Sequence, residues 1–302
     1  MDSRSEMTAG AVWRLVPGHQ PWPEGWLSAG PEPKEMWGTG NPGVLHRMSI
    51  AIVGTRRPSP RGEAVAKRLA HGLARAGWAI ISGMARGIDA AAHQGALDAD
   101  GVTVAVMGTG IDRTYPAAHM GLRRSIEAKG CVVTELEAGS PPLPFHFPRR
   151  NRLVSSLARA VIVVEAPIKS GAMLTAYQAL DQGREVFAVP GPVDCAQTRG
   201  CHKLLREGAH LCEGLDDLHQ VLAKPPNGED SGSPQGIPLP VPGSPARWIW
   251  DRLDLTGLRL SELRHRWNGT DAIWREGLLA LEMSGLIQRL PGEKVIRKVW
   301  IP

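Results

Sequence analysis

Short apolar runs alternate with longer amphipathic segments through the middle of the chain. The first apolar run covers residues 49–53 and is closed by a glycine. Ser59 and Pro60 then supply a helix N-cap and a proline suited to the first helical position. Apolar residues recur at helical spacing until Ala76, and Gly77 favours a stop there. The pattern predicts a strand followed by a helix.

The same alternation continues along the chain. Further strand-like runs lie at 78–82, 102–107, 131–135, 161–165 and 185–189, with helix-like segments at 88–97, 117–128, 149–157 and 171–182. Short apolar strands that alternate with helices predict the α/β class, with a doubly wound parallel sheet covered on both faces. Such sheets bind ligands beyond the carboxyl ends of their strands. We therefore expect the functional residues in the loops that follow these strands.

Composition shifts divide the chain further. Residues 1–48 form a short segment rich in Pro, Gly and Trp, and residues 49–222 hold the predicted sheet. Residues 223–245 are dense in Pro, Gly and Ser, which is typical of a linker. Residues 246–302 show three helical stretches, then two strand-like runs around a turn at 291–294. This order predicts a small C-terminal winged helix-turn-helix domain.

The overall composition is that of a globular protein, with 302 residues of which 42% are hydrophobic and 22% charged. No stretch approaches the ~18 apolar residues of a membrane helix. The first thirty residues lack a secretory pattern. We therefore expect a cytoplasmic protein with no membrane association. Its four cysteines form no Cys-x-x-Cys pair, so we expect neither a metal site nor a disulfide.

Three glycine-containing loops follow predicted strands. They are Gly-Thr-Arg-Arg at 54–57, Ser-Gly-Met-Ala-Arg-Gly at 82–87 and Gly-Thr-Gly at 108–110. Backbone N–H groups and guanidinium groups in such loops favour an anion. None of the loops is a GxGxxG fingerprint and the chain has no Walker motif, so we expect no bound cofactor. One glycine turn alone is usually only a turn, but a formal net charge of +5 permits a polyanionic partner.

The strongest local signal is Phe-Pro-Arg-Arg-Asn-Arg at 147–152. It places three arginines within four positions where a helix is predicted to begin. Cations near the positive end of a helix are unfavourable unless an anion is nearby. Phe147 supplies a flat face on which a nucleobase can stack. The alternative is a solvated basic helix face with Phe147 in the core.

Other polar and aromatic residues allow two interpretations each. Asp89 and His93 are four residues apart on a predicted helix. They form either an acid–base pair or ordinary polar contacts. Glu135 and Glu165 end strands near the expected site, but nothing in the sequence brings them together. Three tryptophans either stack bases or, as we favour, pack the N-terminal segment onto the sheet; they are Trp22, Trp26 and Trp37.

In combination, the motifs resemble one family closely, the DNA-processing protein A (DprA, or Smf) proteins. The resemblance spans roughly residues 22 to 222 and is carried by segments 51–56, 82–89, 92–93, 106–112, 115–116, 147–152, 164–166, 170–176 and 189–191. Residues 281–287 with 291–292 are similar to the family's C-terminal winged-helix domain.

The resemblance implies an extended Rossmann-like domain, residues 49–222, that binds single-stranded DNA in a basic pocket. It also implies a homodimer without enzymatic activity that protects incoming DNA and loads the RecA recombinase onto it during natural transformation. Carried over to this sequence, the DNA-binding residues are Gly54, Arg56, Ser82, Gly83, Arg86, Gly87, Phe147, Arg149, Arg150, Asn151, Arg152, Ser170, Gly171 and Thr175. Many relatives carry a sterile-alpha-motif-like helical domain in front, and the segment 1–48 is too short for a complete one.

Two other functions compete with this one. Related Rossmann-like phosphoribohydrolases hydrolyse nucleotides with a glutamate three positions beyond the threonine of a glycine-rich loop. The corresponding residue here is Gln178, and an amide cannot act as the carboxylate base. A sequence-specific transcription factor would use the winged helix and leave the larger domain without a role. We therefore favour a single-stranded-DNA-binding protein that is not an enzyme.

Overall fold

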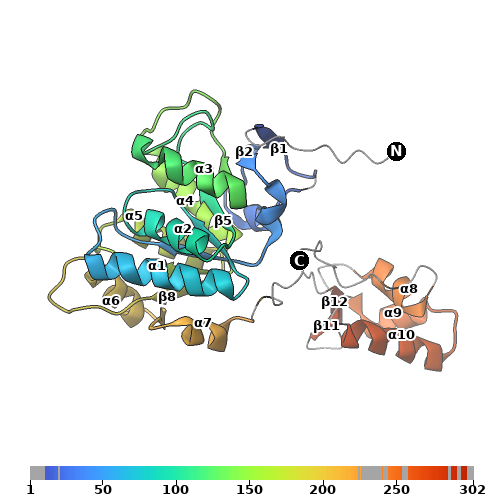
Figure 1. Cartoon of the computed structure of the whole chain (residues 1–302). Coiled ribbons are helices and arrows are strands. Elements are labelled where there is room, and N and C mark those ends of the chain that lie inside the picture. Colours follow the sequence, from blue (N-terminus) through green and yellow to red (C-terminus); the bar gives the residue numbers. More distant parts are fainter. Residues whose placement is uncertain are drawn as a thin grey trace. The chain divides into compact units, whose positions relative to one another are not determined.

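The computed structural model describes residues 11–19, 21–223, 225, 240, 244–253, 258–284, 287–290 and 294–297. The chain divides into two compact units, Met1–Glu229 and Asp230–Pro302 (Figure 1). The division falls within the predicted linker at 223–245, most of which lies outside the described residues. No helix in the described part is long and apolar enough to cross a membrane.

A nine-stranded sheet runs through the first unit in the order β1-β2-β6-β5-β4-β3-β7-β8-β9. Its parallel strands are β3 (Ser49–Val53), β4 (Ala79–Ser82), β5 (Thr103–Val106), β6 (Cys131–Thr134), β7 (Ala160–Val163), β8 (Glu185–Ala188) and β9 (His210–Leu211). The chain builds outward from β3 through β4, β5 and β6, then returns to the other side of β3 with β7. This reversal is the topological switch point of a doubly wound sheet. β9 was not predicted.

The N-terminal segment is part of the same sheet. It supplies β1 (Trp13–Leu15) and β2 (Met36–Gly40), and β2 pairs antiparallel with β6. Two 3₁₀ helices, η1 (Glu24–Ser28) and η2 (Pro42–His46), connect these strands to each other and to β3. Trp22 and Trp26 are buried, and Trp37 packs beside the core, so the packing interpretation of these tryptophans is confirmed. β2 reads Met-Trp-Gly-Thr-Gly, which lacks the apolar alternation by which a strand is recognised.

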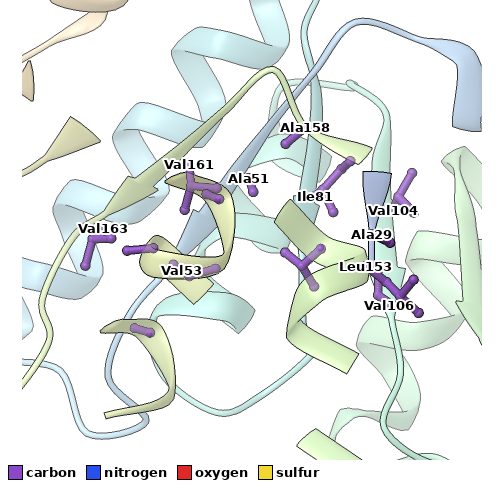
Figure 2. Packing of buried hydrophobic residues seen from close by; sticks show 14 of the residues in the cluster. Ala29, Ala51, Val53, Ile81, Val104, Val106, Leu153, Ala158, Val161 and Val163 are labelled. Carbon is purple, nitrogen blue, oxygen red and sulfur yellow. The ribbon is translucent and has the colours of Figure 1, made fainter. Parts of the chain in front are cut away.

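Helices cover both faces of the sheet. α1 (Pro60–Arg75) and α2 (Ile88–Asp98) lie side by side on one face, where Ile50 and Ile52 of β3 are buried (Figure 1). α4 (His146–Leu157) and α5 (Gly171–Asp181) cover the other face, where Ala51, Val53 and Leu153 belong to one buried cluster (Figure 2). The remaining helices of this unit are η3 (Ala117–His119), α3 (Met120–Lys129), α6 (Arg199–Arg206) and α7 (Leu215–Val221). Successive residues of one strand thus face opposite helical layers.

Two helix starts differ in how well the sequence located them. Ser59 caps α1 by accepting a hydrogen bond from the Gly62 N–H, as predicted. α4 begins at His146, three residues before the predicted start at 149. Pro148 lies within the first turn, where a proline is tolerated because the N–H groups there have no helical partner. The arginines of the 147–152 run therefore lie beyond the first turn of α4.

The second unit has the order of elements predicted for a winged helix. It contains α8 (Pro245–Arg252), β10 (Leu258–Arg259), α9 (Leu260–His265), α10 (Asp271–Met283), β11 (Ile287–Leu290) and β12 (Lys294–Arg297). The strands form an antiparallel sheet in the order β10-β12-β11. β10 was not predicted, and most of the predicted turn at 291–294 lies outside the described residues. That this unit acts as a winged helix stays a prediction.

Candidate functional site

A pocket of about 600 Å³ opens beyond the carboxyl ends of β3 and its neighbours, beside the switch point between β3 and β7. Its volume is within the range of ligand sites, roughly 300–1,000 Å³. The predicted site residues that line it are Gly54, Arg56, Gly83, Phe147, Arg150, Asn151, Ser170, Gly171 and Thr175. The loops after β3, β4 and β7 and the helices α4 and α5 thus converge on one place.

The other predicted site residues do not line the pocket; they are Ser82, Arg86, Gly87, Arg149 and Arg152. The Ser82 hydroxyl is buried and donates to the Ile52 carbonyl at 2.7 Å. Gly87 has a φ of +78°, a conformation that glycine permits, where the chain turns into α2. Arg86 is exposed beside this turn. Sequence spacing does not distinguish the structural roles of Ser82 and Gly87 from ligand contacts. That Arg86, Arg149 and Arg152 contact DNA stays a prediction.

The loop after β3 is fixed by Glu165. The Thr55 N–H donates to the Glu165 carbonyl at 2.6 Å. The buried Glu165 carboxylate accepts from the Ser59 N–H at 2.8 Å and from the Ser59 hydroxyl at 2.6 Å. A protein carboxylate therefore occupies the start of α1, and an incoming anion has no place there. The same loop leaves Arg56 and Arg57 exposed at the pocket.

Arg150 forms part of the pocket wall. Its guanidinium donates to the Gly83 carbonyl at 2.6 Å and also to the Val106 carbonyl. Gly83 is needed here, because a Cβ would lie 2.5 Å from an Arg150 nitrogen. Burial lowers the pKa of Arg150 to about 10, while the nearby Asp89 acts in the opposite direction. The side chain is therefore a fixed positive charge at neutral pH.

Arg149 and Arg152 are held by one buried carboxylate. Glu135 pairs with Arg152 at 2.6 Å and with Arg149 at 3.2 Å. Burial lowers the pKa of Arg152, and Glu135 opposes that shift. The arginine run is therefore not a set of free cations at a helix start. The alternative of a solvated face is also wrong, because Arg150 and Arg152 are buried.

Aromatic rings form one side of the pocket. Phe147 is half-buried, and its ring packs so closely on Gly108 that a Cβ there would lie 2.9 Å from a ring carbon. The Arg56 guanidinium lies over the Phe147 ring, 5.2 Å from its centroid. The Tyr115 ring is 5.5 Å from that of Phe147 and is 42% exposed. Tyr115 belongs to a motif that carries the family resemblance, but no sequence pattern places it beside Phe147.

The N-terminus of α5 faces the same space. Ser170 caps the helix by accepting from the Met173 N–H. The Asn151 amide donates to the Gly171 carbonyl at 3.2 Å, which joins α4 to the start of α5. Thr175 also donates to the Gly171 carbonyl. This helix start carries a partial positive charge and its first residues line the pocket, so it complements an anion.

Asp89 and His93 do not form an acid–base pair. Both are buried, and they bind different groups: Asp89 accepts from the Ala85 N–H, whereas the His93 Nδ1 contacts the Thr103 hydroxyl at 2.7 Å. Burial raises the pKa of Asp89, and the charge of Arg150 opposes this shift. Burial, followed by the charges of His119 and Arg150, lowers the pKa of His93 to about 3. Their interpretation as ordinary polar contacts holds.

Groups that could act as a catalytic base are occupied in other ways. The Gln178 amide donates to the Pro148 carbonyl at 3.4 Å and so braces α5 against α4. Glu135 is paired with arginines, and Glu165 accepts from Ser59, the N-cap residue of α1. Among the described residues no group of three or more His, Cys, Asp or Glu could hold a metal ion. The pocket brings together cations, a helix N-terminus and aromatic rings.

Comparison with known proteins gives the family. A family model described as DNA recombination-mediator protein A matches residues 13–223. The chain belongs to this family. Protein Smf of Escherichia coli is 34% identical over 96% of this chain and 80% of its own length. The chain spans about half the length of other curated relatives that it matches.

Two solved structures of DNA processing protein A have the same fold. The Streptococcus pneumoniae protein superposes with a TM-score of 0.68 at 36% identity, covering 71% of this chain and 75% of that protein. The Helicobacter pylori protein superposes with a TM-score of 0.63 at 28% identity, covering 69% of this chain and 94% of that protein. Its structure is described by its unique single-stranded DNA binding mode. The predicted Rossmann-like α/β fold is thereby confirmed. All residues that line the pocket fall within the part of the chain that matches the recombination-mediator family.

Proposed function

We propose that this recombination-mediator family member binds single-stranded DNA in the pocket beside the β3–β7 switch point. The observation that carries the proposal is the convergence of two kinds of group. Arg56, Arg57 and the start of α5 complement phosphate, and the rings of Tyr115 and Phe147 complement a nucleobase. Neither kind of group alone would select nucleic acid.

The preference for a single strand follows from the position of the rings. Tyr115 and Phe147 line a concave pocket, so a base reaches them only when it is unpaired and turned away from its neighbours. A duplex keeps its bases stacked inside and presents only phosphates to such an opening. The description of the Helicobacter pylori relative as a single-stranded DNA binder supports this choice.

The wider role that we propose is that of a recombination mediator. The chain would protect incoming DNA and load the RecA recombinase onto it during natural transformation, acting as a cytoplasmic homodimer. The family description and the curated relatives support the mediator role. Light scattering should give the mass of a dimer. Recombinase filaments should assemble faster on single strands when the protein is present, and an unchanged rate would contradict the loading role.

Binding is tested with fluorescently labelled oligonucleotides at two salt concentrations. The protein should bind a single strand more tightly than a duplex of the same length. Arg56→Ala should weaken binding to any sequence and reduce the slope of log affinity against log salt by about 0.7 for each lost phosphate contact. Arg75→Ala is the matched control, because Arg75 is exposed near the C-terminal end of α1 and does not line the pocket. Equal loss in both variants would contradict the assigned site.

A further inference from the structure

The exposed aromatic side chains of the described residues gather at the pocket. The chain contains ten Trp, two Tyr and three Phe. Within the part that the structure describes, the aromatic residues that are exposed are Tyr115, at 42%, and Phe145, at 64%. Tyr115 lines the pocket, and Phe145 lies between two residues that line it, Pro144 and Phe147. Single exposed apolar residues are ordinary, but both exposed rings at one pocket indicate a ligand with flat apolar faces.

Phe145 is also held in place. It is the N-cap residue of α4, and the His146 ring stands edge-on to its ring at 4.6 Å and 75°. The His146 Nδ1 contacts the Pro141 carbonyl at 3.0 Å, and the His146 N–H donates to the Leu143 carbonyl. Prolines on both sides of this turn restrict its backbone further. A ring fixed in this way loses little conformational freedom when a flat ligand stacks on it.

Phe145 and Phe147 have different surroundings although one residue separates them. Phe147 packs against Gly108, Arg56 and Tyr115 within the site. Phe145 does not line the pocket and contacts His146 at its edge. A single nucleotide in the pocket therefore leaves the Phe145 ring uncovered. The next group along a bound strand is the one that can reach it.

We propose that Phe145 is a second base-stacking platform, outside the pocket, for the nucleotide adjacent to the one in the pocket. The proposal rests on the proposed function, because it takes single-stranded DNA as the ligand. One base contacts the rings of Tyr115 and Phe147, and a neighbouring base stacks on Phe145. The bound strand then follows the proline-rich segment at 141–148. Because Phe145 is uncharged, it adds affinity without adding salt dependence.

The test compares Phe145→Ala, Phe145→Trp and Leu180→Ala in binding to an oligothymidylate. Leu180 is a matched control, since it is 48% exposed and lies at the end of α5 farthest from Ser170. Phe145→Ala should bind about 5- to 100-fold more weakly, the usual effect of losing one stacked base. The slope against salt and the melting temperature should not change. Phe145→Trp should bind at least as tightly as the natural protein, and Leu180→Ala should bind equally.

A strand of abasic nucleotides separates stacking from other causes. On this strand the natural protein and Phe145→Ala should bind with the same affinity. An equal loss on the abasic and the thymidine strand would overturn the stacking role. The stacking role would also be overturned if Phe145→Ala bound the thymidine strand as tightly as the natural protein does. In either case tight binding by the natural protein would leave the proposed function intact, whereas failure of the natural protein to bind any single strand would refute the proposed function itself.

Discussion

Arg150 shows how a residue of the site can also maintain the fold. Its guanidinium donates to carbonyls of the loop after β4 and of β5, which are 67 and 44 residues away in sequence. Arg56, by contrast, is exposed and stacks on Phe147. Both line the pocket, but the buried arginine compensates polar groups that water cannot reach. The two should therefore respond differently to substitution.

We predict that Arg150→Ala lowers the free energy of unfolding by about 3 kcal/mol, because the buried Gly83 and Val106 carbonyls lose their hydrogen-bond donor. Arg56→Ala should change it by less than about 0.5 kcal/mol, as is usual at exposed positions. Urea titrations of both variants measure the difference. If Arg150→Ala unfolds like the natural protein and yet loses DNA binding, Arg150 is a phosphate ligand and does not brace these loops.

His93 should give the fold a dependence on pH. Its pKa is about 3 in the folded chain against an ordinary value of 6.5. Between these values the unfolded chain binds a proton that the folded chain does not, so stability falls as the pH drops below about 6.5. The fall approaches about 1.4 kcal/mol per pH unit. Asp89, with a raised pKa, acts in the opposite direction wherever its folded form alone is protonated.

We predict that His93→Asn flattens this dependence. Asparagine can still donate to the Thr103 hydroxyl but does not titrate. Urea unfolding between about pH 5 and pH 8 should show the same dependence of stability on pH in both proteins above pH 7. Below that pH the natural protein should lose stability more steeply than His93→Asn. Asp89 is present in both, so its contribution cancels. Identical slopes below pH 6.5 would mean that His93 is protonated in the folded chain.

At the scale of elements, the surface of α10 bears on whether the second unit binds DNA. In a helix-turn-helix the second helix normally contacts DNA. α10 would be this helix, but it exposes Ile273, Leu279 and Met283. Glu276 is exposed on the same helix, and Asp271 at its start is paired with Arg264. Residues 246–302 carry ten Lys and Arg against seven Asp and Glu, a net charge of +3. This charge and surface favour accessory DNA contacts or a protein contact over strong phosphate binding.

We predict that a chain ending at Leu222 keeps most of its affinity for single strands. The truncation retains the nine-stranded sheet and α7, whose Leu218 is part of the core beneath α1. Circular dichroism should show a folded protein, and binding titrations should give an affinity close to that of the full chain. Loss of single-strand binding by a folded truncated protein would move the site away from the pocket.

At the scale of the molecule, the pocket offers cations and rings but no assembled base. Asp89 lines the pocket, but it is buried and accepts from the Ala85 N–H. Near the pocket, Gln178 braces α5, Glu135 binds arginines and Glu165 accepts from Ser59. We therefore predict that nucleoside monophosphates are not turned over. Chromatography of long incubations should detect no sustained release of free base. Release that disappears in Glu135→Gln or Glu165→Gln would establish an enzyme and overturn this assignment.

The sequence by itself determined the features that depend on interactions between residues close together in the chain. The cap of α1 by Ser59, the stop at Gly77 and the apolar strands β3 to β8 are of this kind. The alternation of strand and helix then restricts the fold to a doubly wound sheet, because parallel strands need crossover helices on both faces. Such a sheet places the loops after its strands at one edge. The position of the pocket was therefore predictable.

Only the tertiary structure decided which residues of those loops face the pocket. β2 pairs with β6 through backbone hydrogen bonds, and its side-chain pattern does not predict a strand. Arg152 is directed to Glu135, 17 residues away, and Arg150 to carbonyls of β5 and of the loop after β4, so arginines two positions apart in sequence have unlike roles. The partners of a buried charge are chosen by packing in three dimensions, because a charge removed from water must find compensation wherever the fold supplies it.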